Sequence, residues 1–155
     1  MSEVARIQDQ IRRAFNGEAW HGTALRELLA GLTAREASAR PIRRAHTIWE
    51  LVLHITTWRE VVIRRIGGEP YGELPASEDW TSVPKAAAGA WKRTLADLDR
   101  SQRRLLSAVG TLTDRRLTTR VSGATYDFYV MLHGIVQHDV YHAGQIALIK
   151  KRLRA

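Results

Sequence analysis

The sequence predicts an all-α fold, a four-helix bundle formed by a single domain over residues 1–155. Three observations lead to this prediction. Apolar residues recur at the 3.6-residue spacing of a helix in four long stretches, and turn-forming residues separate these stretches. No stretch has a convincing strand pattern, although residues 121–126 could form a short extended piece. Because each apolar stripe must be buried against another, a bundle is the natural architecture.

The N-terminal third is predicted to contain one helix and two shorter pieces. The first helix runs from Val4 to about Phe15 and is broken by Asn16-Gly17. A second helical piece covers about residues 23–32. A capping-box pattern at Thr33-Ala34-Arg35-Glu36 starts a further turn, which ends at Pro41 because the residue before a proline avoids the helical region.

Three further helices and a polar connection complete the prediction. One helix runs from about Thr47 to Ile66, where Gly67-Gly68 stops it. Residues 69–83 form a polar, turn-rich segment that contains the acidic pair Glu78-Asp79. The next helix starts near Pro84 and extends to about Val109, and the last runs from a cap at about Asp127 to Arg152.

The composition is that of a globular protein, with 45% hydrophobic and 26% charged residues. The absence of cysteine excludes disulfides and thiolate ligands, so any metal site must use histidine, carboxylate or backbone oxygen. No apolar run approaches the length of a membrane span, and the N-terminus lacks the apolar stretch of a secretory signal. We therefore expect a cytoplasmic protein with no membrane partner.

The net charge of +8 raises nucleic acid as a partner. The basic residues, however, are scattered among acidic residues over most of the chain. The densest run, residues 150–154, lies at the end of the last helix, where positive charge complements the helix dipole. We therefore expect no nucleic-acid partner.

Two histidines of the last helix are the strongest functional signal. His138 and His142 are four residues apart, so they lie on one face of the helix, within an otherwise apolar stripe. His54 lies on the inward stripe of another helix, between Leu51 and Trp58. Burying imidazoles without partners is costly, and three of them from two helices suit a metal that keeps positions open for water or substrate. We predict a metal site formed by His54, His138 and His142.

The other histidines are weaker candidates for this site. His46 precedes its helix and His21 lies at a kink, so both are expected to be surface or capping groups. His133 falls on the opposite side of its helix from His138 and His142, which makes it a poor candidate for the same ion.

Four residues near the predicted ligands have open roles. Glu50, four residues before His54, could approach the metal or remain a solvated helix residue. Tyr141 and Gln145 flank His142 and could orient it. Asp139 points away from the metal stripe, so a structural role is favoured. A structural role is the simpler interpretation for all four, and no catalytic residue is assigned.

A second apolar row on the last helix has two interpretations of equal weight. This row contains small residues that permit close approach of another backbone, and a helix that is apolar on two sides is either central or covers a partner. It could form the interface of a homodimer or pack within the bundle. Its members are Val136, Val140, Ala143 and Ala147, with Gly144 beside them.

Two motifs also carry a resemblance. Residues 49–55, Trp-Glu-Leu-Val-Leu-His-Ile, followed by Trp58, and residues 137–146, Gln-His-Asp-Val-Tyr-His-Ala-Gly-Gln-Ile, resemble the two signatures of the DinB-like, damage-inducible helical family. Residues 19–22, Ala-Trp-His-Gly, are also similar to members. The family includes the YfiT-like metal-dependent hydrolases, and the likeness extends over essentially the whole chain. It implies a four-helix bundle, often dimeric, with a divalent metal held by three histidines that correspond to His54, His138 and His142.

Two functional hypotheses follow. The first is a metal-dependent enzyme on a small-molecule substrate, either a hydrolase or a thiol-dependent S-transferase. The family that the chain resembles includes transferases and isomerases that use bacillithiol or mycothiol. The resemblance therefore implies a low-molecular-weight thiol as a candidate cofactor. Zinc or nickel is the expected ion, and iron or manganese would also accept imidazole. The alternative is a non-catalytic, metal-stabilised bundle that acts through dimerisation or a partner in a stress response. The lack of an obvious fourth protein ligand favours the enzyme.

Overall fold

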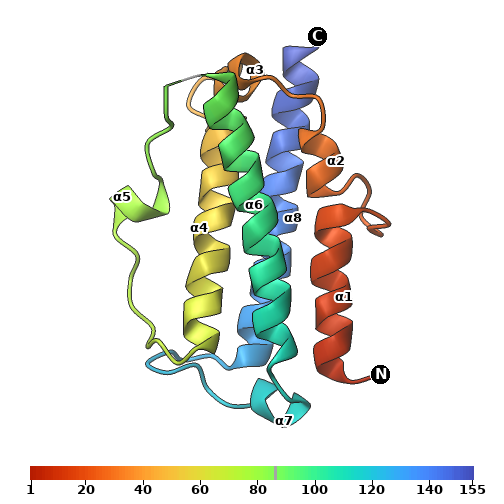
Figure 1. Cartoon of the computed structure of the whole chain (residues 1–155), viewed down its shortest axis with the longest axis vertical. Coiled ribbons are helices and arrows are strands. Elements are labelled where there is room, and N and C mark those ends of the chain that lie inside the picture. The colour runs from red at the N-terminus through yellow and green to blue at the C-terminus, as the bar shows by residue number, and fades with distance from the viewer. Residues whose placement is uncertain (86) are drawn as a thin grey trace.

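The computed structural model describes residues 1–85 and 87–155, and within them it is all-α, which confirms the predicted fold class. Eight helices occur in this part of the chain, and the only pairing of extended residues is an isolated bridge between Arg120 and Asp127. Figure 1 shows four long helices running alongside one another. The long helices are α1 (Glu3–Asn16), α4 (Ile48–Ile66), α6 (Ala88–Gly110) and α8 (Phe128–Leu153). The short ones are α2 (Leu25–Leu29), α3 (Ala34–Ser38), α5 (Ala76–Asp79) and α7 (Asp114–Leu117).

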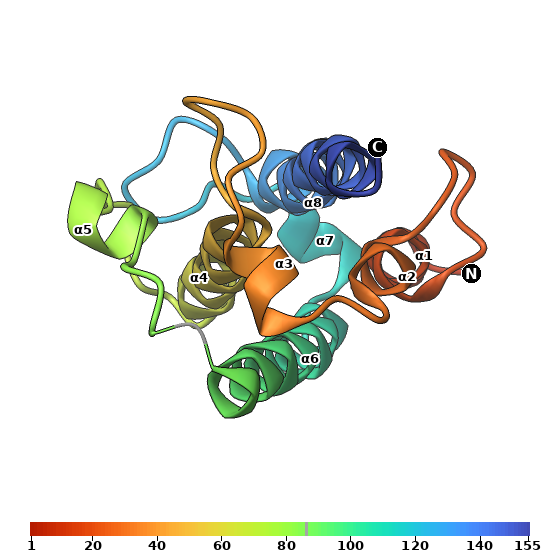
Figure 2. The same ribbon diagram turned by 90° about the horizontal axis from the view of Figure 1, so that it is seen from above.

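The four long helices occupy the corners of a bundle, which Figure 2 shows from above. α4 packs against α6 and α8, and α1 packs against the same two helices from the other side. The short α2 continues the column of α1 and also contacts α8. Consequently α4 and α8, which carry the three predicted ligands, are direct neighbours.

Two hydrophobic clusters fill the bundle. One is built around the buried Trp49 and Trp91, whose ring centroids are 5.1 Å apart. The indole Nε1 of Trp49 donates to Thr94 Oγ1 at 3.0 Å, so this large ring is buried with its polar atom satisfied. The other cluster includes Leu105, near the C-terminal end of α6, and Phe128, at the N-terminal end of α8. Both clusters include residues of α4 and α8, so apolar packing fixes these helices along much of their length.

The predicted helix caps are present. Thr33 and Glu36 form a capping box at the start of α3, and Asp127 accepts a bond from Val130 N at 2.8 Å at the start of α8. A further capping box opens α4, where the carboxylate of Glu50 accepts from Thr47 N at 2.6 Å. Glu50 also pairs with Arg40 at 2.8 Å. The carboxylate of Glu50 therefore serves the cap of α4, and it is not a member of the group formed by His54, His138 and His142.

Several elements differ from the predictions. The helical piece predicted for residues 23–32 is only Leu25–Leu29, because the chain turns at Gly31, which has a left-handed φ of 74°. The helix predicted to begin near Pro84 begins at Ala88; Ala86, within the predicted range, lies outside the described residues. The first buried residue of this helix is Ala90, and the two helical residues before it, Ala88 and Gly89, are exposed. A short helix, α5, forms in the segment predicted to be polar and turn-rich. None of the described helices combines the length and apolar character needed to cross a bilayer.

Candidate metal centre

The bundle brings His54 of α4 together with His138 and His142 of α8. One ring nitrogen from each of the three lies within 4.8 Å of the other two. The Nε2 atoms of His54 and His138 are 3.1 Å apart, although 84 residues separate them in the chain. His54 and His142 are each only 6% exposed, whereas His138 is half-buried. These three histidines form a group that could hold a metal ion, and within the described residues this group has no fourth member.

Hydrogen bonds at Nδ1 set the orientation of two of these rings. His54 Nδ1 donates to the backbone oxygen of Asp79 at 2.9 Å, and His142 Nδ1 donates to Gln145 Oε1 at 2.7 Å. A ring that carries its proton on Nδ1 presents a lone pair at Nε2, which is the form that binds a metal. The orienting role considered for Gln145 thus corresponds to an observed contact.

His138 provides a test of whether a metal fits the site. If His138 Nε2 donated its proton to His54 Nε2, its Nδ1 lone pair would face a carboxylate. Nδ1 of His138 and Oδ1 of Asp139 are both buried without a hydrogen-bond partner, and they lie 3.6 Å apart. A proton on Nδ1 would be attracted to this carboxylate and would leave Nε2 as a lone pair. Two Nε2 lone pairs 3.1 Å apart then need a cation between them, so the donor set fits a metal.

Burial keeps two of the imidazoles neutral. It lowers the pKa of His142 from 6.5 to about 4; the bond to Gln145 opposes this shift, and the neighbouring His138 and His54 add to it. Burial also lowers the pKa of His54, against the opposing effect of its bond to Asp79. Since a metal binds the neutral imidazole, this environment favours the ligating form near neutral pH.

The segment that includes α5 contributes two residues that sequence reasoning did not connect with the site. The indole of Trp80 stacks on His54, with ring centroids 3.9 Å apart and planes within 5°. It also stacks on His46, with centroids 3.5 Å apart. Asp79 Oδ1 accepts from Trp58 Nε1 at 2.7 Å and lies 3.2 Å from His54 Nδ1. In the sequence Asp79 is part of an acidic pair, and no spacing links it to a histidine 25 residues earlier.

The remaining histidines lie apart from the group of three. His133 donates to the backbone oxygen of Tyr129 on its own helix, and His21 is exposed. His46 is an exposed residue, as expected, but it reaches the edge of the site through Trp80. Tyr141 meets His142 edge-on at 5.0 Å between centroids, and among the described residues it forms no hydrogen bond to it.

Asp139 has the structural role that its position on α8 predicted. Its Oδ2 accepts from Nε of Arg59 at 3.0 Å and from Nη2 at 2.6 Å. Both residues are buried, Arg59 completely. This ion pair joins α4 to α8 directly beside His138, so it helps to set the spacing between the two histidine-bearing helices.

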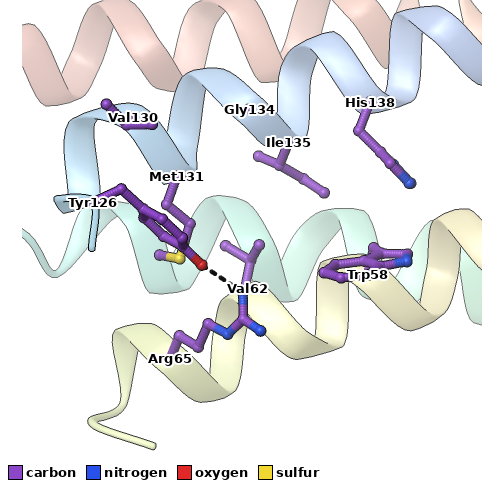
Figure 3. Close-up of a pocket in the computed structure, with 9 residues that line it drawn as sticks. All are labelled: Trp58, Val62, Arg65, Tyr126, Val130, Met131, Gly134, Ile135 and His138. Atoms are coloured by element: carbon purple, nitrogen blue, oxygen red, sulfur yellow. Dashed lines mark hydrogen bonds between the residues drawn. The ribbon is translucent and has the colours of Figure 1, made fainter. Parts of the chain in front are cut away.

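An apolar cavity of about 290 Å³ adjoins His138. It lies between α4 and α8, and Figure 3 shows His138 and Trp58 at one end of it. Its walls are largely aliphatic, including Val62 and Ile135. A reacting group held in this cavity would lie next to a candidate ligand of the metal, as is typical of small-molecule sites.

The fold and the site together define a helical bundle with a three-histidine candidate metal centre beside an apolar cavity. The model of the DinB superfamily matches residues 19–146, and the chain belongs to this superfamily. No curated protein and no solved structure matches the chain significantly.

Proposed function

We propose that this protein is a metal-dependent enzyme acting on a small-molecule substrate, with His54, His138 and His142 as the ligands of one divalent ion. One observation carries the proposal: three imidazoles converge, and their cluster has no fourth member among the described residues. One of the three, His138, also lines an apolar cavity. A structural site would be closed by a fourth protein ligand, whereas a catalytic site keeps a position for a reactant.

The residues around the histidines have separate tasks in this proposal. Asp79 and Gln145 hold the Nδ1 protons of His54 and His142, so that both rings present Nε2. Trp80 covers one face of His54 and limits the access of water to it. Zinc or nickel is the proposed ion, and iron or manganese is also compatible with imidazole ligands. When bound, such an ion would supply Lewis-acid chemistry that polarises a carbonyl or activates a water or a thiol.

Two reaction classes fit this arrangement. In a hydrolase the nucleophile would be water. In a thiol-dependent S-transferase it would be a low-molecular-weight thiol, because the chain has no cysteine to act as the nucleophile itself. The three-histidine arrangement supports both classes equally.

The alternative function is a non-catalytic bundle that acts through dimerisation or a partner in a stress response. It is favoured by several large apolar side chains that are exposed on the surface, namely Trp20, Tyr141 and Leu148. Part of the small-residue row on α8 also remains accessible, since Gly144 is exposed and Val140 is half-buried. A homodimer interface at this row is compatible with either function.

Cobalt substitution separates the two functions, because the visible spectrum of cobalt reports its coordination. We expect azide, or a small thiol such as 2-mercaptoethanol, to change the spectrum of the cobalt-loaded protein. The same samples should hydrolyse activated esters or couple a thiol to an electrophile, and His142→Ala should abolish either reaction. An unresponsive spectrum with cobalt fully bound would favour a closed structural site and the non-catalytic alternative.

A further inference from the structure

The cavity between α4 and α8 has a charged group away from the histidines. In Figure 3, His138 and Trp58 lie at one end, and Arg65 and Tyr126 lie at the other. Arg65 extends from the last turn of α4 towards the middle of the cavity. A molecule that filled the cavity would therefore meet a cation at one end and the candidate metal centre at the other.

The charge of Arg65 has no acidic partner. Its side chain is buried, with the residue only 7% exposed, and no carboxylate of the described residues lies within 4.0 Å of it. Its guanidinium donates to two neutral oxygens, the hydroxyl of Tyr126 at 2.9 Å and the backbone oxygen of Gly72 at 3.5 Å. The faces of Tyr71 and Trp58, at 4.8 and 5.9 Å, compensate the charge only in part.

The other two arginines of α4, Arg59 and Arg64, both have an acidic partner, unlike Arg65. The buried Arg59 pairs with Asp139 at 2.6 Å, and the exposed Arg64 pairs with Glu69 at 3.3 Å. A buried cation without a counter-charge is costly and is retained where it has a use. The unpaired Arg65 is therefore a candidate binding group.

The nearby carboxylates do not neutralise the charge of Arg65. Glu69, Glu73 and Glu78 line a polar depression that Arg65 also borders, but none of the three forms an ion pair with it. All three are exposed to solvent, where their charge is screened. The side of Arg65 that faces the apolar cavity is free of acidic residues.

We infer that the cavity binds a small apolar molecule that carries a carboxylate, and that Arg65 and Tyr126 hold this group. The planar guanidinium matches the two oxygens of a carboxylate. The hydroxyl of Tyr126 accepts a bond from Arg65, which leaves its own proton to donate to the anion. The apolar body fills the cavity, and the reacting group lies beside His138. The position of the reacting group rests on the proposed function, whereas the carboxylate site depends only on the cavity residues.

Binding of a matched pair of ligands tests the inference. Hexanoate and hexanamide have similar size and differ in charge, and calorimetry can measure their affinities for the metal-loaded protein. We expect hexanoate to bind at least about tenfold more tightly, as a hydrogen-bonded charge pair implies. Arg65→Gln should remove this preference, Arg65→Lys should retain part of it, and Arg64→Gln is the matched control that should retain all of it. Circular dichroism and thermal unfolding would establish that each variant is folded.

A second measurement, on the metal-free protein, tests whether Arg65 or the metal ion holds the anion. The preference for hexanoate should persist after the metal is removed with a chelator. A preference that disappears with the metal, or that survives in folded Arg65→Gln, would overturn the inference and place the carboxylate on the ion. Equal or undetectable binding of the two ligands by the wild type would also overturn it. Metal content and catalysis measured on the same samples report on the proposed function separately.

Discussion

Arg59 and Asp139 form a buried ion pair between α4 and α8, with Nη2 and Oδ2 2.6 Å apart, and Asp139 directly follows His138 in the chain. His54 lies about one and a half turns before Arg59 on the same helix, by the 3.6-residue turn of an α-helix. The pair therefore links the two halves of the candidate metal centre. It couples the stability of the bundle to the geometry of the site.

Asp139→Asn should destabilise the protein strongly. The substitution leaves the completely buried charge of Arg59 without a counter-ion, which costs about 3–5 kcal/mol in comparable cases. Chemical denaturation would measure the loss in the free energy of unfolding. Asp97→Asn is the matched control, since Asp97 pairs with Arg100 on the surface and such pairs contribute less than about 1 kcal/mol. A similar small loss in both variants would contradict a structural role for the buried pair.

His142→Ala should remove the metal while the bundle stays folded. Elemental analysis of the wild type is expected to find about one divalent ion per chain, as for a single three-histidine site. The control is His133→Ala. His133 lies on the same helix, but its Nδ1 donates to the backbone oxygen of Tyr129. This variant should retain the ion. Full occupancy in His142→Ala, or equal loss in both variants, would remove His142 from the ligand set.

Gln145→Leu should weaken metal binding without abolishing it. The variant loses the acceptor that holds His142 Nδ1 at 2.7 Å, and loss of such a partner typically reduces metal affinity about 10–100-fold. Competition with a chelator would measure the affinity. Gln137→Leu changes an exposed glutamine of the same helix and should leave the affinity unchanged. Equal affinities for wild type and Gln145→Leu would show that this bond does not orient a ligand.

The metal-free protein should lose stability as the pH falls from about 6.5 towards about 4. Burial lowers the pKa of His142 from 6.5 to about 4 and lowers that of His54 as well. Between these values the unfolded chain binds protons that the folded protein does not, so the free energy of unfolding decreases with decreasing pH. Denaturation of metal-free protein at several pH values would measure this slope.

His142→Gln provides the control for this pH dependence, because it removes one of the two groups and should flatten the slope. Glu36 and Asp114 have pKa values lowered mainly by backbone hydrogen bonds. Their stabilisation is lost as the pH falls below their ordinary pKa values of 4.5 and 3.8, so the slope between about pH 6.5 and about pH 5 reports mainly on the histidines. A slope that is identical in wild type and His142→Gln would show that His142 is not held neutral by the fold.

The sequence alone determined the features that depend on local spacing. Helical periodicity placed the four long helices, and the caps at Thr33 and Asp127 were recognisable because a cap is a contact within a few residues. The same periodicity put His54, His138 and His142 on inward stripes, which was enough to group them before their distances were known.

Tertiary structure alone decided which other groups meet these histidines. The segment after α4 folds back along that helix, which places Asp79 and Trp80 on His54, and no periodic pattern encodes such a return. It also decided that Arg65 is buried without an acidic partner. Burial and charge pairing depend on residues far apart in the chain, so they are properties of the assembled bundle.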